Sequence, residues 1–147
     1  MDPLTALGLA SNVIQIVDVS TRIVSKGQSI YKSADGTLAE NVDAEAVATD
    51  LNLLNTKLQH SLEASKCTEP LSHDDKSLMV LCGKCSALSN ELLWKLNKLK
   101  VTGKHRKWKS ARQALKSVAG KDDVQRFANR LAVYREEINF NITVSLR

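Results

Sequence analysis

Residues 3–17 read PLTALGLASNVIQIV, and no side chain in this stretch is charged. A transmembrane helix needs roughly 20 apolar residues, whereas Asp18 and Arg22 interrupt this run after about 15. A signal peptide begins with a basic region and ends at a small-residue cleavage site, but this chain begins Met1-Asp2-Pro3 and continues without a break to Tyr31. We therefore expect a helix of the mature protein that suits either a protein core or a membrane.

The polar residues of this segment form one narrow stripe when the segment is drawn as a helix. They follow a spacing of three and four: Gly8, Ser11, Gln15, Asp18, Arg22, Ser25 and Ser29. Aliphatic side chains cover the remaining surface, which is far wider than the roughly 100° apolar face of a typical surface helix. Such a helix needs partners on several sides, so it is either a central helix wrapped by a bundle or a helix that also enters or lines a membrane.

The composition predicts one ordinary domain that spans residues 1–147. The hydrophobic fraction is 43% and only six residues are aromatic, so aliphatic side chains must build the core. Three cysteines are an odd number, and without a secretory signal they are expected to be reduced. We therefore expect a cytoplasmic protein.

The net charge of +5 is unevenly distributed along the chain. Ten basic residues and no acidic residue lie between Leu92 and Lys121, whereas nine acidic residues and only Lys57 and Lys66 lie between Asp35 and Asp75. The sequence therefore predicts a basic end and an acidic middle.

Hydrophobic periodicity predicts helices over residues 3–34, 40–64, 74–101 and 105–119, a loop over 65–73, and a last helix that begins near Asp122. Asp35-Gly36, Thr102-Gly103 and Gly120 supply the stop signals. The predicted buried positions are Val47, Leu51, Leu54, Leu58, Leu62, Leu78, Leu81, Cys85, Leu88, Leu92, Leu96, Leu99, Trp108, Ala111, Leu115, Val118, Val124, Phe127, Leu131, Tyr134, Ile138 and Ile142. The predicted fold class is all-α, a four-helix bundle with an additional short helix between the third and last long helices.

The sequence contains no motif of an enzyme, since it lacks a Gly-rich phosphate loop, a nucleophile elbow and an HExxH pair. Cys82 and Cys85 form a CxxC pair, and with Cys67 and His73 nearby a zinc site is one interpretation. The other interpretation is that both cysteines lie inside the third helix, where Cys85 is a core residue. We predict no enzyme, no cofactor and no metal.

The basic residues 104–109, KHRKWK, have three interpretations. They form a solvated helix face, they bind anionic lipid headgroups with Trp108 at the interface, or they bind nucleic acid. No base-reading element is recognisable, so we do not expect a nucleic-acid partner.

Two segments at the ends of the chain resemble a known family. They are MDPLTALGLASNVIQIVDVSTRIVSKGQSIYKSADG, residues 1–36, and GKHRKWKSARQALKSVAGKDDVQRFANRLAVYREEINFNITVSLR, residues 103–147. Both are similar to the N-terminal helical domains of fungal NACHT and other STAND-type NTPases, the fungal NOD-like receptors. This family is close to the HeLo, HeLo-like, SesA and Bell cell-death domains, which are similar to the four-helix domains of the necroptosis executioner pseudokinase and of plant RPW8-type receptors.

The resemblance implies an effector domain that precedes a C-terminal nucleotide-binding module in a longer receptor. Upon assembly into a homo-oligomer, such domains present their first helix to the plasma membrane and permeabilise it, which causes programmed cell death in heterokaryon incompatibility or innate immunity. Some members act instead as adaptors that bind other helical domains without membrane activity. Ala111 and Ala119 stand where many relatives carry bulky residues, which predicts loose packing of the short helix. The uncapped apolar end of the chain, residues 140–147, agrees with a piece of a longer protein.

These observations define three sets of candidate site residues. The expected membrane-inserting residues are Leu4, Leu7, Leu9, Val13, Ile14 and Val17. Gly8, Ser11, Gln15 and Asp18 are expected to line a polar path between inserted helices, since an ionisable group at membrane depth faces water or a partner. Lys104, Arg106, Lys107, Lys109 and Arg112 are expected to contact anionic membrane lipids.

Overall fold

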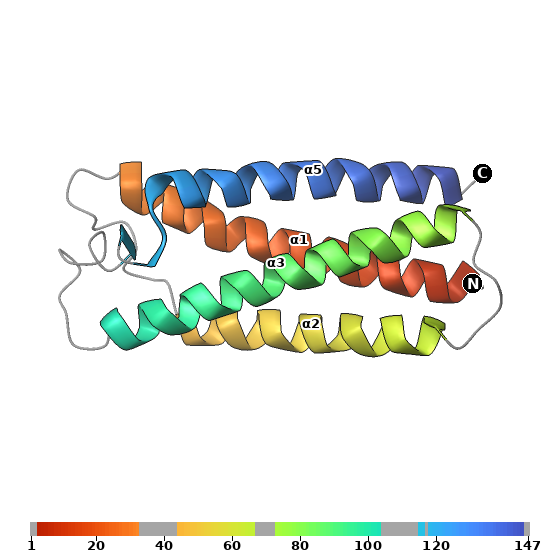
Figure 1. Ribbon diagram of the computed structural model, residues 1–147, viewed down its shortest axis with the longest axis horizontal. Coiled ribbons are helices and arrows are strands. Elements are labelled where there is room, and N and C mark those ends of the chain that lie inside the picture. Colours follow the sequence, from red (N-terminus) through yellow and green to blue (C-terminus); the bar gives the residue numbers. More distant parts are fainter. Residues whose placement is uncertain (1–2, 33–43, 67–72, 104–114, 117, 146–147) are drawn as a thin grey trace.

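Four long helices alternate in direction along one common axis (Figure 1). The computed structural model describes residues 3–32, 44–66, 73–103, 115–116 and 118–145. The long helices are α1 (Pro3–Lys32), α2 (Ala44–Lys66), α3 (His73–Gly103) and α5 (Lys121–Ser145). The beginning of α1 and the end of α5 lie at the same end of the bundle. The predicted all-α four-helix bundle is therefore confirmed.

The short helix between α3 and α5 is described only in part. Leu115, Lys116 and Val118 are helical, and Leu115 is buried as predicted. Trp108 and Ala111, which were predicted to lie on its buried face, are outside the described residues.

The predicted helix ends differ from the observed ones by small amounts where the structure describes them, and the predicted ends at residues 34 and 40 lie outside the described residues. Ser65 was predicted to begin a loop, but it lies inside α2, where its hydroxyl donates to the carbonyl of Ser61 at 2.8 Å and its side chain is buried. At the start of α5, the amide of Val124 donates to the carbonyl of Gly120 at 3.1 Å. The helix thus begins at Lys121, and Asp122 lies in its first turn, where the helix dipole favours an anion.

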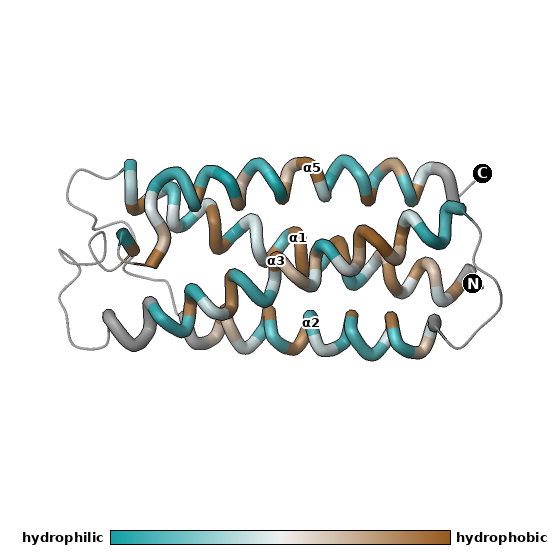
Figure 2. The backbone as a smooth tube through the Cα atoms, viewed as in Figure 1, coloured by the Kyte–Doolittle hydropathy of each residue, from teal (hydrophilic) through white to brown (hydrophobic). Residues whose placement is uncertain are grey.

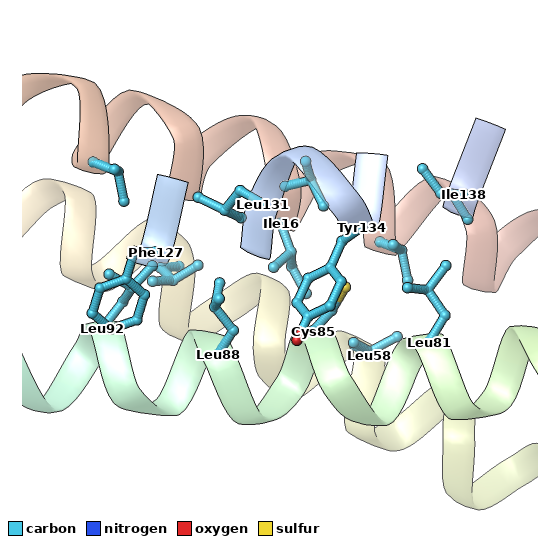
Figure 3. Packing of buried hydrophobic residues seen from close by; sticks show 14 of the residues in the cluster. Ile16, Leu58, Leu81, Cys85, Leu88, Leu92, Phe127, Leu131, Tyr134 and Ile138 are labelled. Carbon is cyan, nitrogen blue, oxygen red and sulfur yellow. The ribbon is translucent and has the colours of Figure 1, made fainter. Parts of the chain in front are cut away.

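Helix α1 packs against α2, α3 and α5, and α3 likewise packs against all three other long helices. The N-terminal half of α1 is mostly hydrophobic, whereas α5 is mostly hydrophilic (Figure 2). Large aliphatic side chains of α1 with less than 2% exposure, among them Leu9 and Ile16, point into a core completed by the other three helices. Figure 3 shows Ile16 among Leu88 of α3 and Leu131 and Tyr134 of α5.

The predicted buried stripes of α2, α3 and α5 are confirmed. All the predicted residues of these helices are buried or half-buried, except Leu99, whose side chain is not described. The prediction omitted Cys82, which is fully buried beside the α3 stripe, and Asn55 of α2. The Asn55 side chain donates to Asn90 Oδ1 and accepts from the Ser86 hydroxyl, both at 2.8 Å, so its burial between α2 and α3 is compensated.

Candidate functional site on the first helix

The six residues of α1 that were predicted to insert into a membrane divide into two groups. Leu9, Val13 and Val17 are buried in the bundle core. Leu4 is 82% exposed and Leu7 is 59% exposed, and Ile14 is also exposed. The six residues therefore do not share one face, and three of them reach a membrane only if α1 leaves the bundle.

The predicted polar stripe lies on the outer surface of α1. Gly8, Ser11, Gln15 and Asp18 are all exposed. A groove of about 380 Å³ runs beside the stripe, lined by Gln15, Asp18, Val19 and Arg22 of α1 and by Asp50, Leu53 and Leu54 of α2. Because the spacing of three and four places Leu4, Leu7 and Ser11 on one side of the helix, the outer surface of α1 carries apolar residues at its beginning and polar residues further along.

Few polar contacts between side chains hold α1 against its neighbours in the described part of the chain. Asp18 and Arg135 of α5 form an ion pair at 3.0 Å, and both side chains are about half exposed. The Asn12 side chain donates to the Ser61 hydroxyl and Gln28 donates to Gln125, each at 3.4 Å. Exposed ion pairs contribute about 0–1 kcal/mol, so the attachment of α1 is chiefly apolar.

Near its end, α1 is also fixed by one buried hydrogen bond. The Tyr31 hydroxyl donates to the carbonyl of Ala119, in the turn before α5. The end of α1 is therefore tied to the chain segment that starts the last helix, whereas its beginning carries exposed side chains.

Two serine hydroxyls lie in the core without compensation. Ser20 of α1 and Ser89 of α3 are 0% exposed, and neither hydroxyl has a hydrogen-bond partner among the described residues. A buried hydroxyl without a partner costs roughly 1–3 kcal/mol. Sequence analysis did not identify Ser20 as a site residue, although it stands outside the polar stripe, among the aliphatic residues of α1.

The residues predicted to contact anionic lipids, Lys104, Arg106, Lys107, Lys109 and Arg112, lie outside the described residues. The end of α3 and the beginning of α5 lie at the end of the bundle opposite to the beginning of α1 (Figure 1). Helix α1 has 30 residues, and at 1.5 Å per residue it spans about 45 Å between the two ends.

Among the basic residues at this end that are described, Lys95 has a structural role. Its ammonium group donates to the carbonyl of Val118 at 3.0 Å and lies 6.0 Å from the ring centre of Phe127. This lysine therefore fastens the short helix to α3.

Both cysteines of the CxxC pair lie inside α3, whereas Cys67, the third thiol of the zinc interpretation, lies outside the described residues. Cys82 and Cys85 are free and buried, and burial is the main cause that raises the pKa of each thiol to about 12. Nucleophilic attack requires the thiolate, which thiols with so high a pKa do not form near neutral pH. Within the described ranges, no group of three histidine, cysteine or acidic residues is placed to hold a metal ion.

A small cavity lies beside the short helix. It has a volume of about 50 Å³ and an almost wholly apolar lining. The lining includes Gly27 of α1, Phe127 of α5, and Leu115 and Ala119 from the segment before α5. Sites for cofactors measure about 300–1,000 Å³, so this cavity is a packing defect. It agrees with the loose packing expected from the alanine at position 119.

In the described part of the chain, one helix is long and apolar enough to cross a membrane. It is α1, over Leu4–Lys32. The central helix of a soluble bundle satisfies the same criterion, so this finding alone is weak evidence. In comparisons with family models, with curated proteins and with solved structures, no match is found.

Proposed function

We propose that this chain is the N-terminal effector domain of a fungal NOD-like receptor and that it causes cell death by permeabilising the plasma membrane with α1. In the resting cytoplasmic protein, α1 stays inside the bundle. A C-terminal nucleotide-binding module assembles several copies, and α1 of each copy then enters a bilayer that contains anionic lipids. The resemblance of residues 1–36 and 103–147 to this family supports the proposal, together with the way in which the bundle holds α1.

The observation that carries the proposal is that α1 is attached almost entirely by contacts that lipid can replace. Its buried hydrophobic residues are Leu9, Ala10, Val13, Ile16, Val17, Val24, Ile30 and Tyr31. Exposing a large aliphatic side chain to water costs about 1.5–3 kcal/mol, so release of α1 into water would cost more than about 10 kcal/mol. This cost equals or exceeds the total free energy of unfolding of many domains. In water, α1 therefore stays packed in the bundle. A bilayer interior is as apolar as the bundle core and returns most of this free energy.

Among the described residues, the polar contacts that α1 would lose on release include one exposed ion pair and two side-chain hydrogen bonds at 3.4 Å, which are weak. They also include the buried hydrogen bond of Tyr31, whose loss adds to the cost of release. Ser20 has no hydrogen bond to lose in the described bundle, and in a membrane its hydroxyl can bond to a neighbouring helix. Asp18 and Arg22 would face water along the polar side of the assembled helices.

Dye leakage from liposomes tests this proposal. Leu7→Glu and Leu53→Glu each place a carboxylate at an exposed leucine, the first on α1 and the second on α2, so neither change disturbs the core. A charge at membrane depth costs about 2.5–3.5 kcal/mol. We expect Leu7→Glu to reduce leakage from anionic liposomes at least tenfold and Leu53→Glu to leave it unchanged. Reversal of the charges at residues 104–109 should also abolish leakage.

An adaptor function without membrane activity is the second candidate. It is favoured by the deep burial of Leu9, Val13 and Val17, which leaves little of α1 available to lipid in the closed bundle. If the protein neither binds liposomes nor releases dye, even when a fused trimeric coiled coil forces it to oligomerise, the membrane proposal is wrong and the adaptor is supported.

A further inference from the structure

A band of exposed apolar side chains lies on the outer side of the seam between α3 and α5. Val80 and Trp94 of α3 are 58% and 56% exposed, and Val133 and Phe140 of α5 are 50% and 69% exposed. Ala87, which is also exposed, stands midway between Val80 and Trp94. The intervals of seven residues on each helix keep these side chains on one face. We call these five residues the outer face.

Two ion pairs show how α3 and α5 are aligned under this face. Lys84 pairs with Glu137 at 3.8 Å, and Glu91 pairs with Arg130 at 3.2 Å. Residues three or four positions apart are neighbours on a helix surface, so Val80 and Phe140 lie beside the first pair. By the same spacing, Ala87 and Val133 lie between the two pairs.

We propose that the outer face binds the outer face of a second copy of this chain. The charges on the seam identify this occupant. Because α3 and α5 are antiparallel, the order of cation and anion along the bundle is opposite on the two helices. Along α3 a cation, Lys84, is followed by an anion, Glu91; beside them on α5 stand the anion Glu137 and the cation Arg130. Such an alternating arrangement is complementary to itself.

A twofold axis parallel to the helices and centred on the seam places α3 of each copy over α5 of the other. Lys84 of one copy then faces Glu137 of the other, and Glu91 faces Arg130, so each ion pair becomes a ring of four alternating charges. The same axis brings Val80 of one copy against Phe140 of the other and Ala87 against Val133. An anionic lipid surface is a less specific partner, because Glu91 and Glu137 balance Lys84 and Arg130 and the seam carries no net positive charge.

This arrangement has two consequences for the molecule. From Val80 to Trp94 the face is about 20 Å long, and two helices that are each about 10 Å wide make it about 20 Å across. It therefore covers roughly 400 Å² per copy, about 800 Å² in total, which is below the standard size and gives at most a weak, reversible interface. Both copies point in the same direction, so the beginnings of their α1 helices lie at the same end of the dimer. The inference depends on α3 and α5 alone and does not require membrane activity.

Sedimentation equilibrium of the full chain, without lipid, from about 10 µM to 1 mM tests the inference, since a face of this size gives weak association. We expect a reversible monomer–dimer equilibrium. Phe140→Ser should weaken it at least tenfold, whereas Leu53→Ser, at an exposed leucine on α2, should not change it. Circular dichroism serves as the control that each variant is folded.

Charge reversal provides the sharper test. Lys84→Glu and Glu137→Lys each place like charges opposite each other in a homodimer, so neither variant should dimerise alone. An equal mixture of the two variants should form a heterodimer, because opposite charges then meet across the interface. A monomer at every concentration overturns the inference, and so does a dimer that tolerates Phe140→Ser and both charge reversals. If Phe140→Ser reduces liposome binding while the chain remains monomeric, the outer face binds lipid and the inference is wrong.

Discussion

At the scale of a single residue, Ser20 lowers the stability of the bundle core. Its hydroxyl is fully buried and has no partner in the described core, on the helix that we propose to be released. A well-packed bundle would place an alanine there. The free energy lost at this position lowers the cost of removing α1 from its neighbours.

We predict that Ser20→Ala stabilises the protein and reduces its membrane activity. Removing an uncompensated buried hydroxyl should raise the free energy of unfolding by about 1–2 kcal/mol, which corresponds to roughly 2–8 °C in Tm for a domain of this size. Ser11→Ala is the matched control, since it offers the same gain in helix propensity at an exposed position of α1. Thermal unfolding and dye leakage measure both effects. Equal stabilisation by the two changes would show that the hydroxyl of Ser20 is compensated.

The buried thiols predict how stability depends on alkaline pH. Burial raises the pKa of Cys82 and Cys85 from 9.0 to about 12, so the native state retains protons that the unfolded chain loses above pH 9. Their contribution to stability is therefore complete below pH 9 and declines between pH 9 and 12, by about 1.4 kcal/mol per pH unit for each thiol. Urea unfolding of the wild type and of the Cys82→Ala, Cys85→Ala double variant separates this decline from the titration of lysines and tyrosines. An identical pH dependence of the two proteins would contradict it.

At the scale of the helix, the contact between α1 and α5 includes Gly27. A Cβ atom at this position would lie 3.5 Å from Val124 Cγ1 and 4.0 Å from Leu115 Cδ2, which are ordinary van der Waals distances. Gly27 also lines the apolar cavity of about 50 Å³. The glycine is thus not required by close approach of the neighbouring helices.

We predict that Gly27→Ala stabilises the bundle by about 1 kcal/mol through helix propensity, with a further gain from contact with Val124. Gly83→Ala, at an exposed helical glycine with nothing within 4 Å of the added atom, measures the gain from propensity alone. Chemical denaturation gives both values. Lower stability of Gly27→Ala than of the wild type would mean that this contact is already too tight for a methyl group.

The helices themselves were predictable from the sequence, because their aliphatic residues repeat with a helical period and Gly120 marks a break. The side of α1 that faces inward could have been read from its polar stripe, but the predicted membrane-inserting set combined both sides of the helix. Leu7 lies four positions before Ser11 of the stripe and is exposed, whereas Leu9 lies on the opposite side and is buried. The buried hydroxyl of Ser89 was not predictable, since an isolated serine in an apolar stripe gives no information about its partners.

At the scale of the whole molecule, the two ends of the bundle have different roles in the proposed function. The exposed Leu4 and Leu7 lie near the beginning of α1, and the end of α3 lies at the opposite end of the bundle, about 45 Å away along α1. If the bundle stands upright on a flat membrane, only one of its two ends can contact the membrane while α1 remains packed in the bundle. Release of α1 removes this conflict, because the helix can then enter the bilayer independently of the remaining helices.

Pulsed electron paramagnetic resonance between spin labels on α1 and α2 tests this release most directly. Ser11→Cys and His60→Cys provide exposed labelling sites on the two helices, close to the hydrogen bond between Asn12 and Ser61. Cys67→Ser removes one native thiol, and Cys82 and Cys85 are expected to react slowly with the label because both are buried in the core. His60→Cys with Gly83→Cys is the control pair, which spans α2 and α3.

In solution, both pairs should give a short and narrow distance distribution. In anionic liposomes that leak dye, the distance between positions 11 and 60 should become long and broad, while the distance between positions 60 and 83 should not change. An unchanged distance between positions 11 and 60 in leaking liposomes would contradict the account, because the membrane would then be permeabilised by a bundle that still encloses its first helix.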